Sequence, residues 1–142
     1  MKKDDVSADI KKILTQYRTV AIVGASPNPE RPSYRVADFL KKEGFRVIPV
    51  TPNADNVVGE KAYPDLASIP VPVEVVDIFR RPEDVPPIVD EAIAIGAKAV
   101  WMQEGIVNEE AATNARKAGL TVVMDHCMMK ELLKKLGREK EI

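Results

Sequence analysis

Short apolar runs alternate with amphipathic segments along nearly the whole chain. The apolar runs cover residues 20–23, 46–51, 73–79, 99–102 and 121–124, and each has the length of one strand. The segments between them mostly carry apolar residues at helical spacing. Strands that are apolar throughout are buried on both faces, which is typical of a parallel sheet covered by helices on both sides. The pattern therefore predicts an α/β fold, a Rossmann-like doubly wound parallel sheet of five strands.

The boundaries of the helices follow from capping residues and glycines. Ser7, Ser33 and Asn108 are predicted N-caps, and a helix is expected after Asp84 and another over residues 128–136. Right-handed crossovers lead us to expect the strand order 3-2-1-4-5, counted along the chain. Pro49 removes one hydrogen-bond donor from the second strand. Residues 52–69 are expected to be irregular, with one helical turn near Leu66.

Length, charge and cysteine content limit the class of protein. With 142 residues and a net charge of −1, we expect a single domain, residues 1–142, with residues 1–18 as an N-terminal helix packed on it. The charge balance argues against a nucleic-acid partner, and no apolar run is long enough to span a membrane. The N-terminus has no signal core, which predicts a cytoplasmic protein. The single cysteine, Cys127, excludes an internal disulfide and a cysteine-based metal cluster, so no metal site is expected. A charged content of 30% is compatible with a thermostable protein.

The segment 19–40 carries the strongest functional signal. A strand ends at Gly24, a turn containing Ser26, Arg31, Ser33 and Arg35 follows, and then a helix begins. A tight turn between a strand and a helix exposes backbone N–H groups, and the helix N-terminus adds positive potential. Arginines beside such a turn are bidentate donors to phosphate. The turn is therefore predicted to bind a phosphorylated ligand.

The carboxyl ends of the other strands should lie on the same rim as this turn. They carry Pro52 and Asn53, then Arg80 and Arg81, then Gln103. Ligands of doubly wound sheets bind at this rim. Two roles stay open for the arginines: they contact a ligand, or they pair with the neighbouring Glu83 and Asp84.

The sequence favours coenzyme A over a nicotinamide dinucleotide as the ligand. Gly24 is followed by Ala25 and Ser26, so the G-x-G-x-x-G fingerprint of dinucleotide sites is absent. No acidic residue ends the second strand to hold a ribose hydroxyl. Coenzyme A (CoA) carries an additional ribose 3′-phosphate, which suits the basic residues of the rim. A dinucleotide of the NAD type remains an alternative ligand.

Several segments together resemble a known family. They are GASPNPERPSYRVADFL, FRVIPVTPN, GEKAYPDLASIP, VVDIFRRPEDV, VWMQEGIVNEEA and VVMDHCMMKE. They look like the small stand-alone CoA-binding proteins of bacteria and archaea, which are similar to the CoA-binding domain of the succinyl-CoA synthetase alpha subunit. The resemblance covers residues 19–136. It implies a protein that binds CoA or an acyl-CoA without catalysis of its own, with no protein partner indicated. The CoA contacts it implies are Gly24, Ala25, Ser26, Arg31, Ser33, Arg35, Pro52, Asn53, Arg80 and Gln103.

One motif departs from this family. Its end motif resembles D-R-C with a later histidine, whereas this chain has Asp125, His126 and Cys127, and Leu132 at the later position. Natural drift and deliberate engineering both remain explanations. Engineering would give a rim nucleophile and base, so Ser26 or Cys127 with His126 forms an alternative hydrolase or acyl-transfer site. A catalytic site of this kind would also need an orienting group and an oxyanion hole, which the sequence does not indicate.

Overall fold

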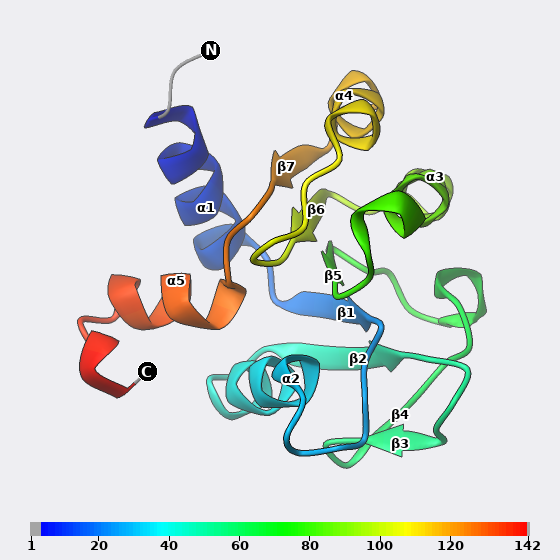
Figure 1. Ribbon diagram of the computed structural model, residues 1–142, viewed down its shortest axis with the longest axis vertical. Coiled ribbons are helices and arrows are strands. Elements are labelled where there is room, and N and C mark those ends of the chain that lie inside the picture. Colours follow the sequence, from blue (N-terminus) through cyan, green and yellow to red (C-terminus); the bar gives the residue numbers. More distant parts are fainter. Residues whose placement is uncertain (1–3, 142) are drawn as a thin grey trace.

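The computed structural model describes residues 4–141 and confirms the predicted α/β fold (Figure 1). The central sheet is parallel and has five strands in the order β2-β1-β5-β6-β7. These strands are Thr19–Val23 (β1), Arg46–Val50 (β2), Val75–Ile78 (β5), Ala99–Met102 (β6) and Thr121–Val123 (β7). A two-stranded antiparallel sheet, Asn56–Val57 (β3) with Glu60–Lys61 (β4), lies beyond the β2 edge.

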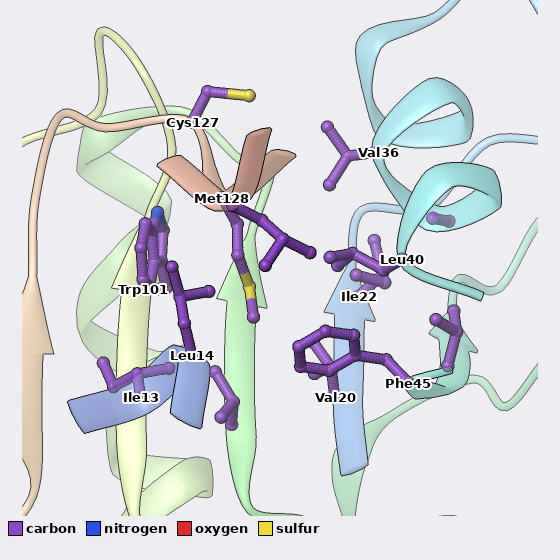
Figure 2. Close-up of a cluster of buried hydrophobic side chains, with 14 of the residues drawn as sticks. Ile13, Leu14, Val20, Ile22, Val36, Leu40, Phe45, Trp101, Cys127 and Met128 are labelled. Atoms are coloured by element: carbon purple, nitrogen blue, oxygen red, sulfur yellow. The ribbon is translucent and has the colours of Figure 1, made fainter. Parts of the chain in front are cut away.

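Helices cover both faces of the sheet. Helices α1 (Asp4–Gln16), α2 (Pro32–Lys42) and α5 (Met128–Lys135) lie on one face, and α3 (Val85–Ala94) and α4 (Glu109–Lys117) lie on the other (Figure 1). Short 3₁₀ helices are Leu66–Ser68 (η1), Pro82–Asp84 (η2) and Glu139–Glu141 (η3). On the first face, Ile13 of α1, Leu40 of α2 and Met128 of α5 pack around Trp101 and Ile22 of the sheet (Figure 2). The strands are mostly apolar because each face meets a helical layer, and the buried Asp77 in β5 is an exception.

The predicted strand order is wrong. The third strand of the prediction, β5, pairs with β1 and β6, so the order counted along the chain is 2-1-3-4-5. Strand β2 is therefore an edge strand, and Pro49 supplies the physical reason. The Pro49 carbonyl accepts a hydrogen bond from the Tyr63 N–H on the outer side of β2, at 3.0 Å, so the proline nitrogen also faces outward. An interior β2 would lose a ladder hydrogen bond at this position, whereas an edge strand does not.

The helix caps were predicted with mixed success. Asn108 caps α4 as expected, because its side chain accepts a hydrogen bond from the Ala111 N–H at 2.9 Å. Ser33 does not cap α2: the cap is Arg31, and Ser33 lies buried in the first turn. Ser7 lies inside α1, which begins at Asp4. Within the predicted irregular stretch, η1 confirms the turn near Leu66, whereas the β3–β4 pair was not predicted.

Candidate functional site

A cavity of about 940 Å³ opens at the carboxyl ends of the central strands. Its walls come from the tips of β1, β2, β5 and β6 and from the first turns of α2 and α5. Every residue predicted to contact CoA lines this one cavity: Gly24, Ala25, Ser26, Arg31, Ser33, Arg35, Pro52, Asn53, Arg80 and Gln103. The sheet brings these residues together because parallel strands present their carboxyl ends on the same side.

Gly24 is required by the close approach of β1 and β5. Its φ is +87°, and a Cβ at this position would lie 2.4 Å from the carbonyl oxygen of Phe79. The N–H groups of Gly24 and Ala25 donate to the Val50 carbonyl at 3.0 and 3.3 Å. The free N–H groups expected of this turn are therefore not those of Gly24 and Ala25. Their hydrogen bonds fasten the turn to β2 instead.

The unpaired donors of this loop lie further along it. Among residues 4–141, the N–H groups of Ser26 and Ser33 and the Ser33 hydroxyl have no hydrogen-bond partner. Ser33 is only 4% exposed, and it lines the cavity. A buried polar group without a protein partner needs one from solvent or a ligand. The start of α2 therefore presents free donors to the cavity, where the helix dipole also adds positive potential.

Two arginines of the cavity wall carry charge that no carboxylate neutralises within the described part of the chain. Arg35 donates only to the carbonyl oxygen of Glu30, at 3.3 Å, and Arg31 forms no ion pair there. The first turn of α2 contains no acidic residue. Their guanidinium groups are available to an anion in the cavity.

Unlike those of Arg31 and Arg35, the side chains of Arg80 and Arg81 both lie close to a carboxylate, that of Asp84. Arg81 Nε is 3.0 Å from Asp84 Oδ2, and Arg80 Nη2 is 3.7 Å from the same oxygen. The hydrogen bond from Arg81, with its charge and that of Arg80, holds the pKa of the Asp84 carboxyl below its usual value. Of the two roles left open by the sequence, the ion pair with Asp84 is present. Arg81 Nη1 also lies 3.7 Å from Glu83 Oε2, so two carboxylates balance the charge of the two arginines at the β5 tip.

Gln103 connects the tip of β6 to the start of α5. It is 4% exposed, and its Oε1 accepts a hydrogen bond from the Met128 N–H at 3.2 Å. Its Nε2 makes no hydrogen bond within residues 4–141, although the side chain lines the cavity. Nearby, Lys130 lies 3.0 Å from Glu104, and both also line the cavity. The α5 end of the cavity is thus polar and held in place by hydrogen bonds.

The proposed catalytic candidates do not form one cluster. Ser26 and Cys127 line the cavity, but His126 does not. The Nδ1 atom of His126 lies 3.2 Å from Glu131 Oε2, and within the described residues its ring has no hydrogen bond to either nucleophile candidate. The Ser26 hydroxyl instead accepts from the Asn28 N–H at 3.1 Å. The family resemblance suggested a histidine at position 132. Leu132 lies in α5, and its side chain is buried in the core.

Sequence reasoning did not assign several residues of the cavity wall. Val36, Ile106, Met129 and Lys130 belong to it, and they come from α2, the loop after β6 and the first turn of α5. Helix α5 reaches the cavity because it packs beside α2. The available signal was that α5 directly follows a strand tip, which places its first turn at the rim. Among residues 4–141, no group of three His, Cys, Asp or Glu side chains could hold a metal ion.

A comparison with protein families decides the classification. The CoA binding domain model matches residues 18–132. The chain belongs to the CoA binding domain family. Within residues 4–141, no helix has the length and apolar composition needed to cross a membrane.

Individual relatives agree with this classification. The uncharacterized protein YneT of Bacillus subtilis is 39% identical over 121 residues, which are 85% of this chain and 90% of that protein. Acetate–CoA ligase [ADP-forming] II of Archaeoglobus fulgidus is 31% identical over 100 residues, which are 69% of this chain but only 15% of the ligase. A solved structure of a hypothetical protein from Pyrococcus horikoshii OT3 is 45% identical, with a TM-score of 0.88 over 92% of each chain. This chain is thus similar to a whole small protein and to a small part of a large ligase.

Proposed function

We propose that this protein binds coenzyme A, free or acylated, in the cavity at the carboxyl ends of the strands, without catalysing a reaction. The observation that carries the proposal is the gathering of the predicted contact residues around one cavity with two unpaired arginines. Membership of the CoA binding domain family supports the same ligand.

The phosphates of CoA would lie at the start of α2. The free N–H groups of Ser26 and Ser33, the Ser33 hydroxyl and the guanidinium groups of Arg31 and Arg35 surround this end of the cavity. Such donors satisfy several phosphate oxygens at once, and the helix dipole strengthens each contact. Arg80 and Arg81 would add weaker attraction, because Asp84 and Glu83 offset their charge.

The pantetheine arm would extend toward α5. This end of the cavity combines the apolar side chains of Ile106 and Met129 with the free Nε2 of Gln103. Pantetheine has the matching chemistry, because it carries a geminal dimethyl group and two amides. The adenosine would then occupy the β2 side, where Pro52 and Asn53 line the wall. In this arrangement, the thiol or thioester of CoA lies near Cys127.

A binding role without catalysis fits the position of the histidine. His126 is the only histidine in the chain, and its imidazole faces Glu131 and lies outside the cavity wall. A general base must reach the nucleophile or its water within hydrogen-bond distance. The described cavity wall offers no such contact from His126, so we assign the histidine a structural role in the loop before α5, beside Glu131.

Calorimetric titration of the purified full chain tests the proposal. CoA should bind more tightly than CoA lacking its 3′-phosphate, and both should bind more tightly than NAD. Arg35→Ala should weaken CoA binding by about 1.5–3 kcal/mol, the usual range for a hydrogen bond to a charged group. Arg116→Ala removes the same charge from the exposed surface of α4, outside the cavity, and should leave the affinity unchanged.

Two results would contradict the assignment. Equal or tighter binding of NAD would favour the dinucleotide alternative. A dissociation constant for CoA that is the same in Arg35→Ala and the unsubstituted protein would place Arg35 outside the ligand contact.

A further inference from the structure

Cys127 lies at the α5 end of the cavity. It is the N-cap of α5, is 6% exposed and belongs to the cavity wall. In Figure 2 its sulfur points across toward α2, on the side where Val36 lies, and Val36 also lines the cavity. A thiol that is otherwise buried is thus accessible mainly through the cavity. A ligand held there can reach this sulfur, whereas reagents with no affinity for the cavity meet it rarely.

A second feature, Gln103, offers a polar group to a ligand at this end of the cavity. Gln103 is 96% buried, yet its Nε2 has no hydrogen-bond partner within residues 4–141. Its Oε1 accepts a hydrogen bond from the N–H of Met128, the residue after Cys127, so the amide is held at the start of α5. Within residues 4–141, the enclosed side-chain atoms without a partner are the two Asp77 oxygens, so the Gln103 amide nitrogen keeps access to the cavity. A ligand carrying a carbonyl oxygen a short distance from a sulfur atom would satisfy both groups.

The start of α5 places positive potential near Cys127. Cys127 has no side-chain cap hydrogen bond, and it sits at the positive end of the α5 dipole. The ammonium of Lys130 is close enough to Cys127 for an electrostatic interaction that, after the larger effect of Glu104, helps to raise the pKa of Lys130. The thiolate is the form of a cysteine that attacks a disulfide.

We propose that Cys127 forms a reversible mixed disulfide with coenzyme A bound in this cavity. The inference rests on the proposed function. The oxidised partner is a disulfide of CoA, such as the symmetrical CoA disulfide. The Cys127 thiolate attacks one sulfur, the Cys127–CoA bond forms, and the S–S bond of the reagent breaks. One CoA leaves as a thiolate and takes a proton from water, so Cys127 is oxidised and one CoA is reduced. A free thiol reverses the step by the same exchange.

The cavity should make this reaction selective. The nucleotide end of one CoA unit would be held by Arg31 and Arg35, and its pantetheine arm would carry the disulfide to the α5 end. The attack then becomes intramolecular, which raises the effective concentration of the disulfide at Cys127. A small disulfide without a nucleotide lacks this advantage. A site that binds CoA should therefore make Cys127 react faster with CoA disulfide than with a small disulfide, whereas a thiol that is only reactive should show no preference.

Intact-mass spectrometry of the full chain measures the reaction. The reduced protein is incubated with CoA disulfide or with oxidised glutathione at equal concentration, and samples are quenched with acid over time. One CoA should add per chain, and dithiothreitol should remove it. We expect CoA disulfide to react at least ~10-fold faster than oxidised glutathione. This factor is smaller than the gain that effective concentration usually gives to a tethered reaction. The preference should disappear in denaturant and shrink in Arg35→Ala, while Arg116→Ala should retain it. Because Cys127 is the only cysteine, Cys127→Ser should form no adduct.

The outcomes separate this inference from the proposed function. Binding of reduced CoA by calorimetry without adduct formation would overturn the inference and leave CoA binding intact. Equal rates with both disulfides would also overturn it, because Cys127 would then react without guidance from the cavity. Absence of CoA binding in reducing buffer would show that the proposed function itself has failed.

Discussion

At the scale of single residues, two separate features of the structure require a glycine at position 24. Its φ is positive, and the space for a Cβ is occupied by the Phe79 carbonyl oxygen. Gly96 also has a positive φ, of +77°, but nothing lies within 4 Å of its Cβ position. Gly96→Ala thus measures the conformational cost alone, about 1–2 kcal/mol. Gly24→Ala should lower the free energy of unfolding by a further ~1–3 kcal/mol, because β1 and β5 must separate. Urea unfolding of both variants measures the difference, and equal losses would show that the turn relaxes freely.

Asp77 is a buried carboxyl group whose cost should appear in the pH dependence of stability. It lies in β5 between Ile22 and Trp101, is 0% exposed, and neither carboxyl oxygen has a hydrogen-bond partner within residues 4–141. Burial raises its pKa well above the usual range. The folded state then binds a proton that the unfolded state has released, so stability falls as pH rises from about 4 through the folded-state pKa.

Asp77→Asn should remove this part of the pH dependence, because the amide does not titrate. Its stability relative to the unsubstituted protein should improve by at least about 1 kcal/mol between pH 4 and pH 8, the equivalent of one unit of pKa difference. Urea unfolding across this range measures the effect. Asp90→Asn, at an exposed position of α3, should follow the unsubstituted protein. Parallel curves for both variants would mean that the pKa of Asp77 is the same in the folded and the unfolded state.

At the scale of elements, the sequence was sufficient for the sheet but not for its order. The apolar runs predicted the five main strands because each strand is buried on both faces, which leaves an unbroken signal in the residues. The strand order depends on whether β5 pairs with β1 or with the far edge of β2, and the apolar pattern of the residues is the same for either arrangement. Pro49 carried the missing information: a residue without an N–H suits an edge strand, which places β2 at the edge and β5 inside.

Part of the candidate site could be predicted from the sequence, and part depends on contacts between segments that are far apart in the chain. The strand tips were predicted to meet, because a parallel sheet fixes where its strands end. The walls contributed by Met129 and Lys130 could not be predicted in this way, because they depend on how α5 packs beside α2. The hydrogen bonds from Gly24 and Ala25 to Val50 also escaped prediction, because they require the register of β1 against β2.

At the scale of the whole molecule, the cavity joins segments that are far apart in the sequence. Its walls run from Gly24 to Lys130, and they include four strand tips and the first turns of two helices. The unfolded chain cannot reproduce this arrangement, so a ligand of the cavity binds the folded state alone. Ligand binding should therefore be coupled to global stability.

The coupling gives a test of the site that is independent of calorimetry. At a CoA concentration of 100 times its dissociation constant, linkage adds about 2.7 kcal/mol to the free energy of unfolding. For a domain of this size, the melting temperature should rise by about 10 °C. At the same CoA concentration, Arg35→Ala should show about half of this shift or less, since a tenfold loss of affinity removes about 1.4 kcal/mol of the linkage. Arg116→Ala should show the full shift. Differential scanning fluorimetry in reducing buffer measures all three proteins, and an equal shift in Arg35→Ala would mean that CoA stabilises the fold from a different site.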